Sequence, residues 1–320
     1  MSRLDNRGVP AVIVGTETGL LTFDDGASSV LHSLEGQGVR AVAPAGSKTL
    51  WAAVDGQEIW RGDVGGDAWT RVASLATLGD PRLVVDCLAD TRANDPEGIL
   101  VGTSQARLVR VDRGRVALVD GFENAPGRAR WYTPWGGPPD VRSITEDRAA
   151  VYVNVHVGGV LRSRDGGATW QPTIEISADV HRVVTGDGNV YAAGARGLSV
   201  SSDAGESWRI ATRGLHATYC RSVAVCGSTL LVSASDGPSG GRAAVYRSTD
   251  GAQTFERCGV GMPDWFDGNI DSLCLDALPD GALAAFASEP GELFTSTDRG
   301  ATWSRAAERL GRVTCVLVMP

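Results

Sequence analysis

The stretch Ser-Arg-Asp-Gly-Gly-Ala-Thr-Trp at residues 163–170 is the strongest indication of the fold, because nearly the same eight residues return further along the chain. Close copies are "SSDAGESW" at 201–208 and "STDRGATW" at 296–303, and a looser copy, "STDGAQTF", lies at 248–255. Sequence self-similarity at a period of roughly 20–50 residues is the signature of a repeat fold. The chain is therefore expected to consist of repeated supersecondary units.

Aspartates at the repeated position mark seven units. The four copies place them at Asp165, Asp203, Asp250 and Asp298, and weaker copies upstream offer Asp24, Asp63 and Asp112. Each unit contains short β-branched and aromatic runs between glycine-rich turns, which is the pattern of strands joined by hairpins. Four strands in ~40–50 residues make one blade of a propeller. We therefore predict an all-β, seven-bladed β-propeller of four-stranded antiparallel blades, formed as a single domain by residues 1–320.

The two ends of the chain are expected to meet in one blade. The chain ends on "RVTCVLVMP", residues 312–320, which has the pattern of a lone inner strand. It begins on "PAVIVGTETG", residues 10–19, which has the pattern of a second strand. We therefore expect the C-terminal strand to complete blade one, which would leave no exposed strand edge between the ends.

Composition limits the classes of function. The net charge of −8 and a pI near 5.1 argue against a general nucleic-acid binder. No apolar run approaches the ~18 residues that a membrane span needs, and the first residues lack the pattern of a signal peptide. We therefore expect a cytoplasmic protein with no membrane partner. The six cysteines form no CxxC pair and are expected to be buried, reduced thiols.

The repeated string resembles the Asp-box, or BNR, repeat of sialidase-like propellers. The copy at 248–255 departs from that pattern, with Ala252 in place of glycine and Phe255 in place of tryptophan. The aspartate of such a string can accept backbone N–H groups within a hairpin turn, and its glycine can supply a positive φ. In the families that share the repeat, this turn joins the third and fourth strands, on the face opposite the active site. The resemblance thus implies a structural role for the motif aspartates.

Residues at the start of the inner strands indicate a candidate site on the other, top face. The aligned positions carry arginine in five of seven blades, and they are Arg40, Arg82, Arg142, Arg182, Arg221, Asp271 and Thr314. Propeller symmetry would bring these side chains to the mouth of the central channel, where arginine suits carboxylate and phosphate groups. The alternative is that each arginine pairs with a carboxylate, such as Asp80, Asp140, Asp179 or Asp271, and ties blades together.

Other segments expected on the top face carry aromatic and histidine side chains. The connection 121–140 holds Trp131, Tyr132 and Trp135, and "GMPDWFDGN" at 261–269 holds Trp265 and Phe266. We take the five arginines, Trp135 and Trp265 as ligand-binding candidates. The catalytic candidates are His156, His181, His216, Tyr219 and Asp271. The histidines show no reliable metal-ligand spacing, so neither a metal nor another cofactor is expected.

Two classes of function remain open. One is a ligand-binding or assembly module for an anionic small molecule, an acidic peptide or a protein partner, since the repeat also resembles that of photosystem II assembly-factor and sortilin-type propellers. The other is an enzyme on the same scaffold. A sialidase-like glycosidase would use an arginine triad from Arg142, Arg182 and Arg221 with Tyr219 as nucleophile, but its N-terminal Phe/Tyr-Arg-Ile-Pro element is absent. A lyase or hydrolase of an anionic substrate could use a top-face histidine or aspartate. A carboxylate-pair glycosidase could combine Asp271 with Asp236, Glu289 or Asp140.

Overall fold

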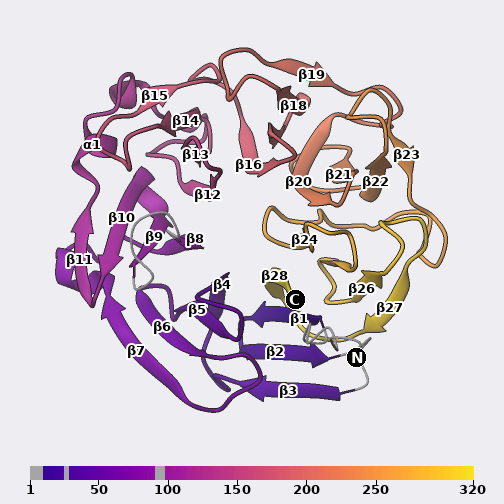
Figure 1. Cartoon of the computed structure of the whole chain (residues 1–320), viewed down its shortest axis with the longest axis horizontal. Helices are drawn as coiled ribbons and strands as arrows, with labels where there is room; N and C mark the ends of the chain where they lie inside the picture. The colour runs from indigo at the N-terminus through magenta and orange to yellow at the C-terminus, as the bar shows by residue number, and fades with distance from the viewer. Residues whose placement is uncertain (1–9, 25–28, 91–97) are drawn as a thin grey trace, which may run out of the picture.

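Seven four-stranded antiparallel sheets form a closed ring in the computed structural model of the chain, which describes residues 10–24, 29–90 and 98–320. Figure 1 shows the first strand of each sheet nearest the centre and the fourth at the rim. The seven-bladed β-propeller expected from the repeat is thus confirmed. None of the helices in the described part of the chain has the length and apolar character that crossing a bilayer requires.

The four strands of each blade follow one another from the channel outwards. Blade one consists of β28 (Val313–Met319), β1 (Ala11–Thr16), β2 (Gly19–Asp24) and β3 (Ser29–Ser33). Blade two consists of β4 (Val39–Pro44), β5 (Thr49–Val54), β6 (Glu58–Asp63) and β7 (Trp69–Ser74). Blade three consists of β8 (Val85–Asp90), β9 (Gly98–Thr103), β10 (Arg107–Asp112) and β11 (Arg115–Leu118). Blade four consists of β12 (Val141–Glu146), β13 (Val151–Val155), β14 (Gly159–Ser163) and β15 (Gln171–Pro172).

The remaining three blades have the same order. Blade five consists of β16 (Val180–Gly186), β17 (Asn189–Gly194), β18 (Gly197–Ser201) and β19 (Arg209–Ala211). Blade six consists of β20 (Tyr219–Cys226), β21 (Thr229–Ser235), β22 (Ala244–Ser248) and β23 (Glu256–Arg257). Blade seven consists of β24 (Leu275–Ala277), β25 (Ala284–Ala287), β26 (Leu293–Ser296) and β27 (Ser304–Ala307). Short helical turns are α1 (Asp120–Glu123), η2 (Leu75–Leu78), η3 (Ser104–Ala106) and η4 (Arg128–Arg130).

The C-terminal strand closes the ring in the way the sequence predicted. β28 pairs antiparallel with β1, with Ala11 opposite Met319 and Val14 opposite Val316. Blade one therefore takes its inner strand from one end of the chain and its other three from the opposite end. The pairing joins the first and last units through a complete backbone ladder, so the ring has no open seam.

Burial explains why the second strands are apolar almost throughout. Each second strand pairs with one strand on either side within its own sheet. The two faces of that sheet pack against the adjacent blades, so side chains on both faces of the strand are covered. All six residues of β1 and of β9, and all seven of β21, are buried. Their sequences are accordingly near-continuous runs of apolar or small residues rather than alternating ones. The outermost strands are more exposed, and both residues of the short strands β15 and β23 are exposed.

The repeated motif forms the same turn in four blades, between the third and fourth strands. In blade four, Ser163 Oγ lies 2.8 Å from Asp165 Oδ1 and accepts the Gly167 N–H at 2.8 Å. Asp165 also accepts the backbone N–H and the hydroxyl of Thr169 at 2.9 and 2.6 Å. The same serine–aspartate pair recurs as Ser201–Asp203, Ser248–Asp250 and Ser296–Asp298. The motif aspartates thus satisfy turn backbone on the bottom face.

Backbone conformation explains the glycine of the motif and its one exception. Gly167, Gly205 and Gly300 have φ of 96°, 86° and 78°, a region that favours glycine. Ala252 takes the equivalent place with φ of 62° and is completely buried. The departing copy therefore keeps the same turn and carries the strain of a non-glycine residue there.

Candidate functional site

Strand register defines which residues face the channel mouth. Near its start, each inner strand of blades one to six shifts register by a bulge. The residues within these bulges are Thr314, Arg40, Asp86, Arg142, His181 and, in blade six, Arg221 with Ser222. A bulge leaves one residue out of the ladder and redirects its side chain. The mouth therefore carries a mixed ring of arginine, aspartate, histidine and threonine.

Two arginines that the sequence pattern assigned to the ring lie elsewhere. Arg82 precedes β8 in an exposed turn, where it pairs with Asp80 at 2.8 Å, so its assignment to the inner strand was wrong. The residue at that position of blade three is Asp86. In blade five the bulged residue is His181, one place before Arg182. The pattern misplaced Arg82 because it lies before the strand begins, and it misplaced Arg182 because a shift of one residue moves a strand side chain to the other face.

The remaining arginines of the ring are paired with carboxylates. Arg40 donates to Asp86 at 3.2 Å and to the Val85 carbonyl at 2.9 Å, which ties blade two to blade three. Arg221 of blade six forms a close ion pair with Asp271 of the segment that leads into blade seven. Arg142 lies 3.8 Å from Asp140. The contacts of Arg40 and Arg221 join neighbouring blades, as the alternative expects, whereas that of Arg142 lies within one blade.

The segment that leads into blade seven reaches into the channel, which stays open as a cavity on its bottom side. The guanidinium of Arg182 donates to the carbonyls of Ser272 and Leu275 at 2.7 and 2.5 Å, and lies 3.7 Å from Asp276. Leu273 packs against the apolar clusters of blades two to four, on the far side of the channel. Arg182 lines a cavity of about 820 Å³ on the bottom side. It therefore does not join Arg142 and Arg221 in a top-face triad.

A hollow of about 510 Å³ opens on the top face between blades one, two, three and seven. Asp86 and Asp271 line it together with Arg40 and Thr314. Burial and the nearby Asp140 carboxylate raise the pKa of Asp86 to about 7, despite the pairing with Arg40. Asp86 Oδ2 is buried and has no hydrogen-bond partner among the described residues. The hollow thus holds one carboxyl group poised to be protonated near neutral pH.

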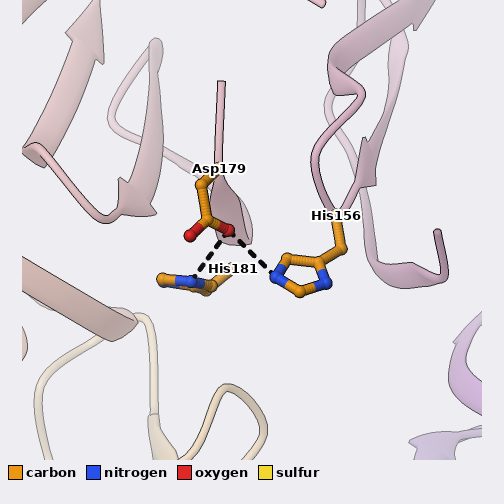
Figure 2. Close-up of side chains that lie close together, drawn as sticks. All are labelled: His156, Asp179 and His181. Carbon is orange, nitrogen blue, oxygen red and sulfur yellow. Dashed lines mark ion pairs between the residues drawn. The ribbon is translucent and has the colours of Figure 1, made fainter. Parts of the chain in front are cut away.

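Two of the three top-face histidines meet at one carboxylate. Figure 2 shows the side chain of Asp179 between the rings of His156 and His181. Asp179 Oδ1 lies 2.9 Å from His156 Nε2 and 3.1 Å from His181 Nε2. His156 follows β13 in the turn that leads to β14, and Asp179 and His181 flank the first residue of β16. Blades four and five therefore supply this cluster jointly.

Aromatic rings cover the histidine–aspartate cluster. Trp135 lies over the ring of His156 with centroids 5.2 Å apart, and Tyr219 lies over that of His181 at 4.8 Å. Burial raises the pKa of Tyr219, which works against a phenolate nucleophile. Trp131, from the same connection as Trp135, is buried against Phe122 and caps the core.

A separate group of residues surrounds Trp265 above blade six. The guanidinium of Arg257 lies 4.5 Å from its ring centroid, that of Arg242 lies 5.8 Å away, and the His216 ring lies 4.7 Å away. His216 Nδ1 is 2.6 Å from the Tyr246 hydroxyl, and burial lowers the pKa of this imidazole. His216 therefore belongs to this aromatic group and not to the cluster around Asp179.

Sequence reasoning missed Asp86, Asp276 and Leu273. Asp86 sits in "VVDCLAD", where the expected register of blade three began four residues too early. Counting back from the apolar pair Ile99–Leu100 to the apolar run before it would have been the available signal. Asp276 and Leu273 contact residues of other blades across the channel. No local sequence pattern indicates contacts of this kind.

Comparisons with known proteins show the fold. No protein-family model and no curated protein sequence matches the chain. Among solved structures, a GH74 xyloglucanase from Xanthomonas campestris is similar at 20% identity and a TM-score of 0.69, over 95% of this chain and 53% of that one. The chain thus spans about half the length of the xyloglucanase. YCF48 bound to D1 peptide is similar at 15% identity and a TM-score of 0.59, over 87% and 85% of the two chains. A computationally designed protein, Ika8, reaches 0.57 at 12% identity, over 93% and 85%.

Proposed function

We propose that the chain is a binding propeller of the Asp-box type, whose top face takes an acidic peptide or a similar anionic ligand. The four identical motif turns support the Asp-box assignment. The observation that carries the binding proposal is the pair of exposed tryptophans on this face, Trp135 at 67% and Trp265 at 37% exposure. Large aromatic side chains left exposed beside cations are enriched in binding surfaces.

The distribution of these groups favours a peptide over a small molecule. Trp135 belongs to the connection before blade four, and Trp265 belongs to the one before blade seven. The nearby cations are likewise on different blades: Arg257 lies beside Trp265, and Arg142 lies near His156, whose ring contacts Trp135. A ligand that contacts both tryptophans must extend across several blades, as an extended peptide does. Among the similar structures, the YCF48 propeller is described as bound to a peptide.

Binding can be tested with labelled acidic peptides that contain aromatic residues. Trp135→Ala and Trp265→Ala are expected to weaken binding at least ~10-fold each, because anchors of this kind contribute about 1–2 kcal/mol or more. Ile210→Ala is the matched control, since Ile210 is 57% exposed on the outer strand of blade five. Equal loss in the control, or no loss in either tryptophan variant, would refute the proposal. A neutral peptide of the same length tests the requirement for negative charge.

A second candidate, a glycoside hydrolase, is favoured by one observation. Asp86, with its pKa raised to about 7, shares the 510 Å³ hollow with Asp271. A protonated carboxyl group and a second carboxylate flanking one bond are the requirement of glycosidic cleavage. The test is release of reducing sugar from xyloglucan and from aryl glycosides. Asp86→Asn and Asp271→Asn should abolish any turnover, and Asp80→Asn, outside the hollow, should not.

A further inference from the structure

We propose that His156, Asp179 and His181 form a binding site for one divalent transition-metal ion of the Zn²⁺ class. The site lies on the top face between blades four and five, and it does not depend on the proposed peptide binding. One ligand atom from each residue lies within 4.8 Å of the other two. Two imidazoles and one carboxylate are a donor set that Zn²⁺ and related ions prefer.

The hydrogen bond of His181 fixes its tautomer in favour of a metal. Its Nδ1 lies 2.7 Å from the Cys220 carbonyl oxygen, which can only accept a hydrogen bond. Nδ1 therefore carries the proton, and in the neutral ring Nε2 presents a lone pair towards Asp179. Metal-binding histidines almost always make such a bond through the nitrogen that does not bind the ion.

Unpartnered donor atoms converge on the same point. His181 is completely buried, and its Nε2 has no hydrogen-bond partner among the described residues. Asp179 Oδ1 likewise has no hydrogen-bond partner among the described residues, although the Nε2 atoms of His156 and His181 both lie within ion-pair distance of it. A lone pair held 3.1 Å from a carboxylate oxygen is unfavourable unless a positive charge lies between them. A shared cation would satisfy both atoms at once and would take His156 Nε2 as a third ligand.

The distances suit coordination. Metal–nitrogen and metal–oxygen bonds of about 2.1 Å at tetrahedral angles separate neighbouring ligand atoms by roughly 3.4 Å. The observed separations from Asp179 Oδ1 are 2.9 and 3.1 Å, and all three ligand atoms lie within 4.8 Å of one another, so side-chain movements could bring them to coordination distance around one ion. Figure 2 shows one nitrogen of each imidazole ring facing the Asp179 carboxylate. His156 comes from the turn after β13, and His181 comes from β16.

Charge and access also permit an ion. Asp179 supplies one negative charge, and the nearby cation, Arg142, is itself beside Asp140 at 3.8 Å. The side chain of Asp179 is 30% exposed, so an ion can arrive from solvent, whereas Trp135 and Tyr219 shield the two rings. Three protein ligands leave a fourth position for water or a ligand group.

The test is metal binding by the full chain after treatment with a chelator. Zn²⁺ and Co²⁺ are titrated separately, with bound metal measured by mass spectrometry and the Co²⁺ geometry by visible absorption. We expect one ion per chain and a four- or five-coordinate Co²⁺ spectrum without a thiolate charge-transfer band. Saturation well below one equivalent, or a thiolate band from any of the six cysteines, would overturn the proposal.

Variants assign the ion to this cluster. Asp179→Asn and His156→Gln are expected to lower Zn²⁺ affinity at least about 100-fold, since loss of an outer-shell partner alone costs about 10–100-fold. His216→Gln is the matched control, because that imidazole lies on the same face with its Nε2 3.8 Å from Asp236. Unchanged binding in both cluster variants, or loss in the control, would overturn the assignment. If one cluster variant does not fold, the other variant and the wild-type Co²⁺ spectrum still decide the question.

Discussion

Replacing Arg182 with alanine tests whether this arginine ties blades together or holds a ligand. Its side chain is 12% exposed, and beside Asp276 it donates to the carbonyls of Ser272, before blade seven, and of Leu275, in β24. Removing one partner of a buried ion pair costs about 3–5 kcal/mol, because the other charge is left uncompensated. We therefore expect Arg182→Ala to lower the free energy of unfolding by about that amount.

The size of the thermal effect follows from chain length. At about 2.1 cal/mol/K per residue, 320 residues give an unfolding entropy near 0.7 kcal/mol/K, so a loss of ~4 kcal/mol lowers Tm by roughly 6 °C. The assay is differential scanning calorimetry with chemical unfolding as a second measure. Arg82→Ala is the control, because Arg82 is 71% exposed and its pairing with Asp80 should leave Tm unchanged within error.

The pH dependence of the stability of Arg182→Ala tests whether the Asp276 carboxylate is the charge left uncompensated. Burial raises the pKa of Asp276, and loss of Arg182 would raise it further. A carboxyl group whose pKa is raised on folding contributes stability at low pH and loses it as pH rises. The loss of unfolding free energy caused by Arg182→Ala should therefore be larger at pH 8 than at pH 5. The double variant Arg182→Met with Asp276→Leu should recover much of that loss. If Arg182→Ala is as stable as the wild type but no longer binds an anion, Arg182 holds a ligand and does not tie blades together.

Three further predictions concern the turn, the hollow and the thiols. Ser163→Ala leaves the buried N–H of Gly167 without an acceptor and should cost about 1–3 kcal/mol in unfolding free energy, measured in urea; an unchanged midpoint would contradict the role of the turn. Asp86 has a pKa near 7 in the folded chain, above its value when unfolded, so wild-type stability should fall by at most about 4 kcal/mol as pH rises from about 4 to 8. In Asp86→Asn that slope should be reduced, and an equal slope would exclude this group as its source. All six cysteines are buried and free, so a thiol reagent should titrate none in the native protein and all six in denaturant.

The propeller, its blade number and its closure are encoded in short-range sequence patterns. The motif turn is stabilised within eight residues, as the contacts of Asp165 with Ser163 and Thr169 show, so its signal survives in the local string. Strand periodicity is likewise local, and it located β1 and β28 well enough to predict that they share a blade. The burial of all six thiols followed from the apolar runs that contain them.

The contacts of the top-face residues, by contrast, depend on the folded ring. The repeat pattern began blade three four residues too early, and the bulge in blade five shifts the register by one residue, so Asp86 and His181 occupy the places predicted for Arg82 and Arg182. The contacts that matter join residues far apart in the chain: Arg40 to Asp86 across 46 positions and Arg182 to Leu275 across 93. The physical reason is that a side chain's charge partner depends on closure of the whole ring, which no local pattern encodes.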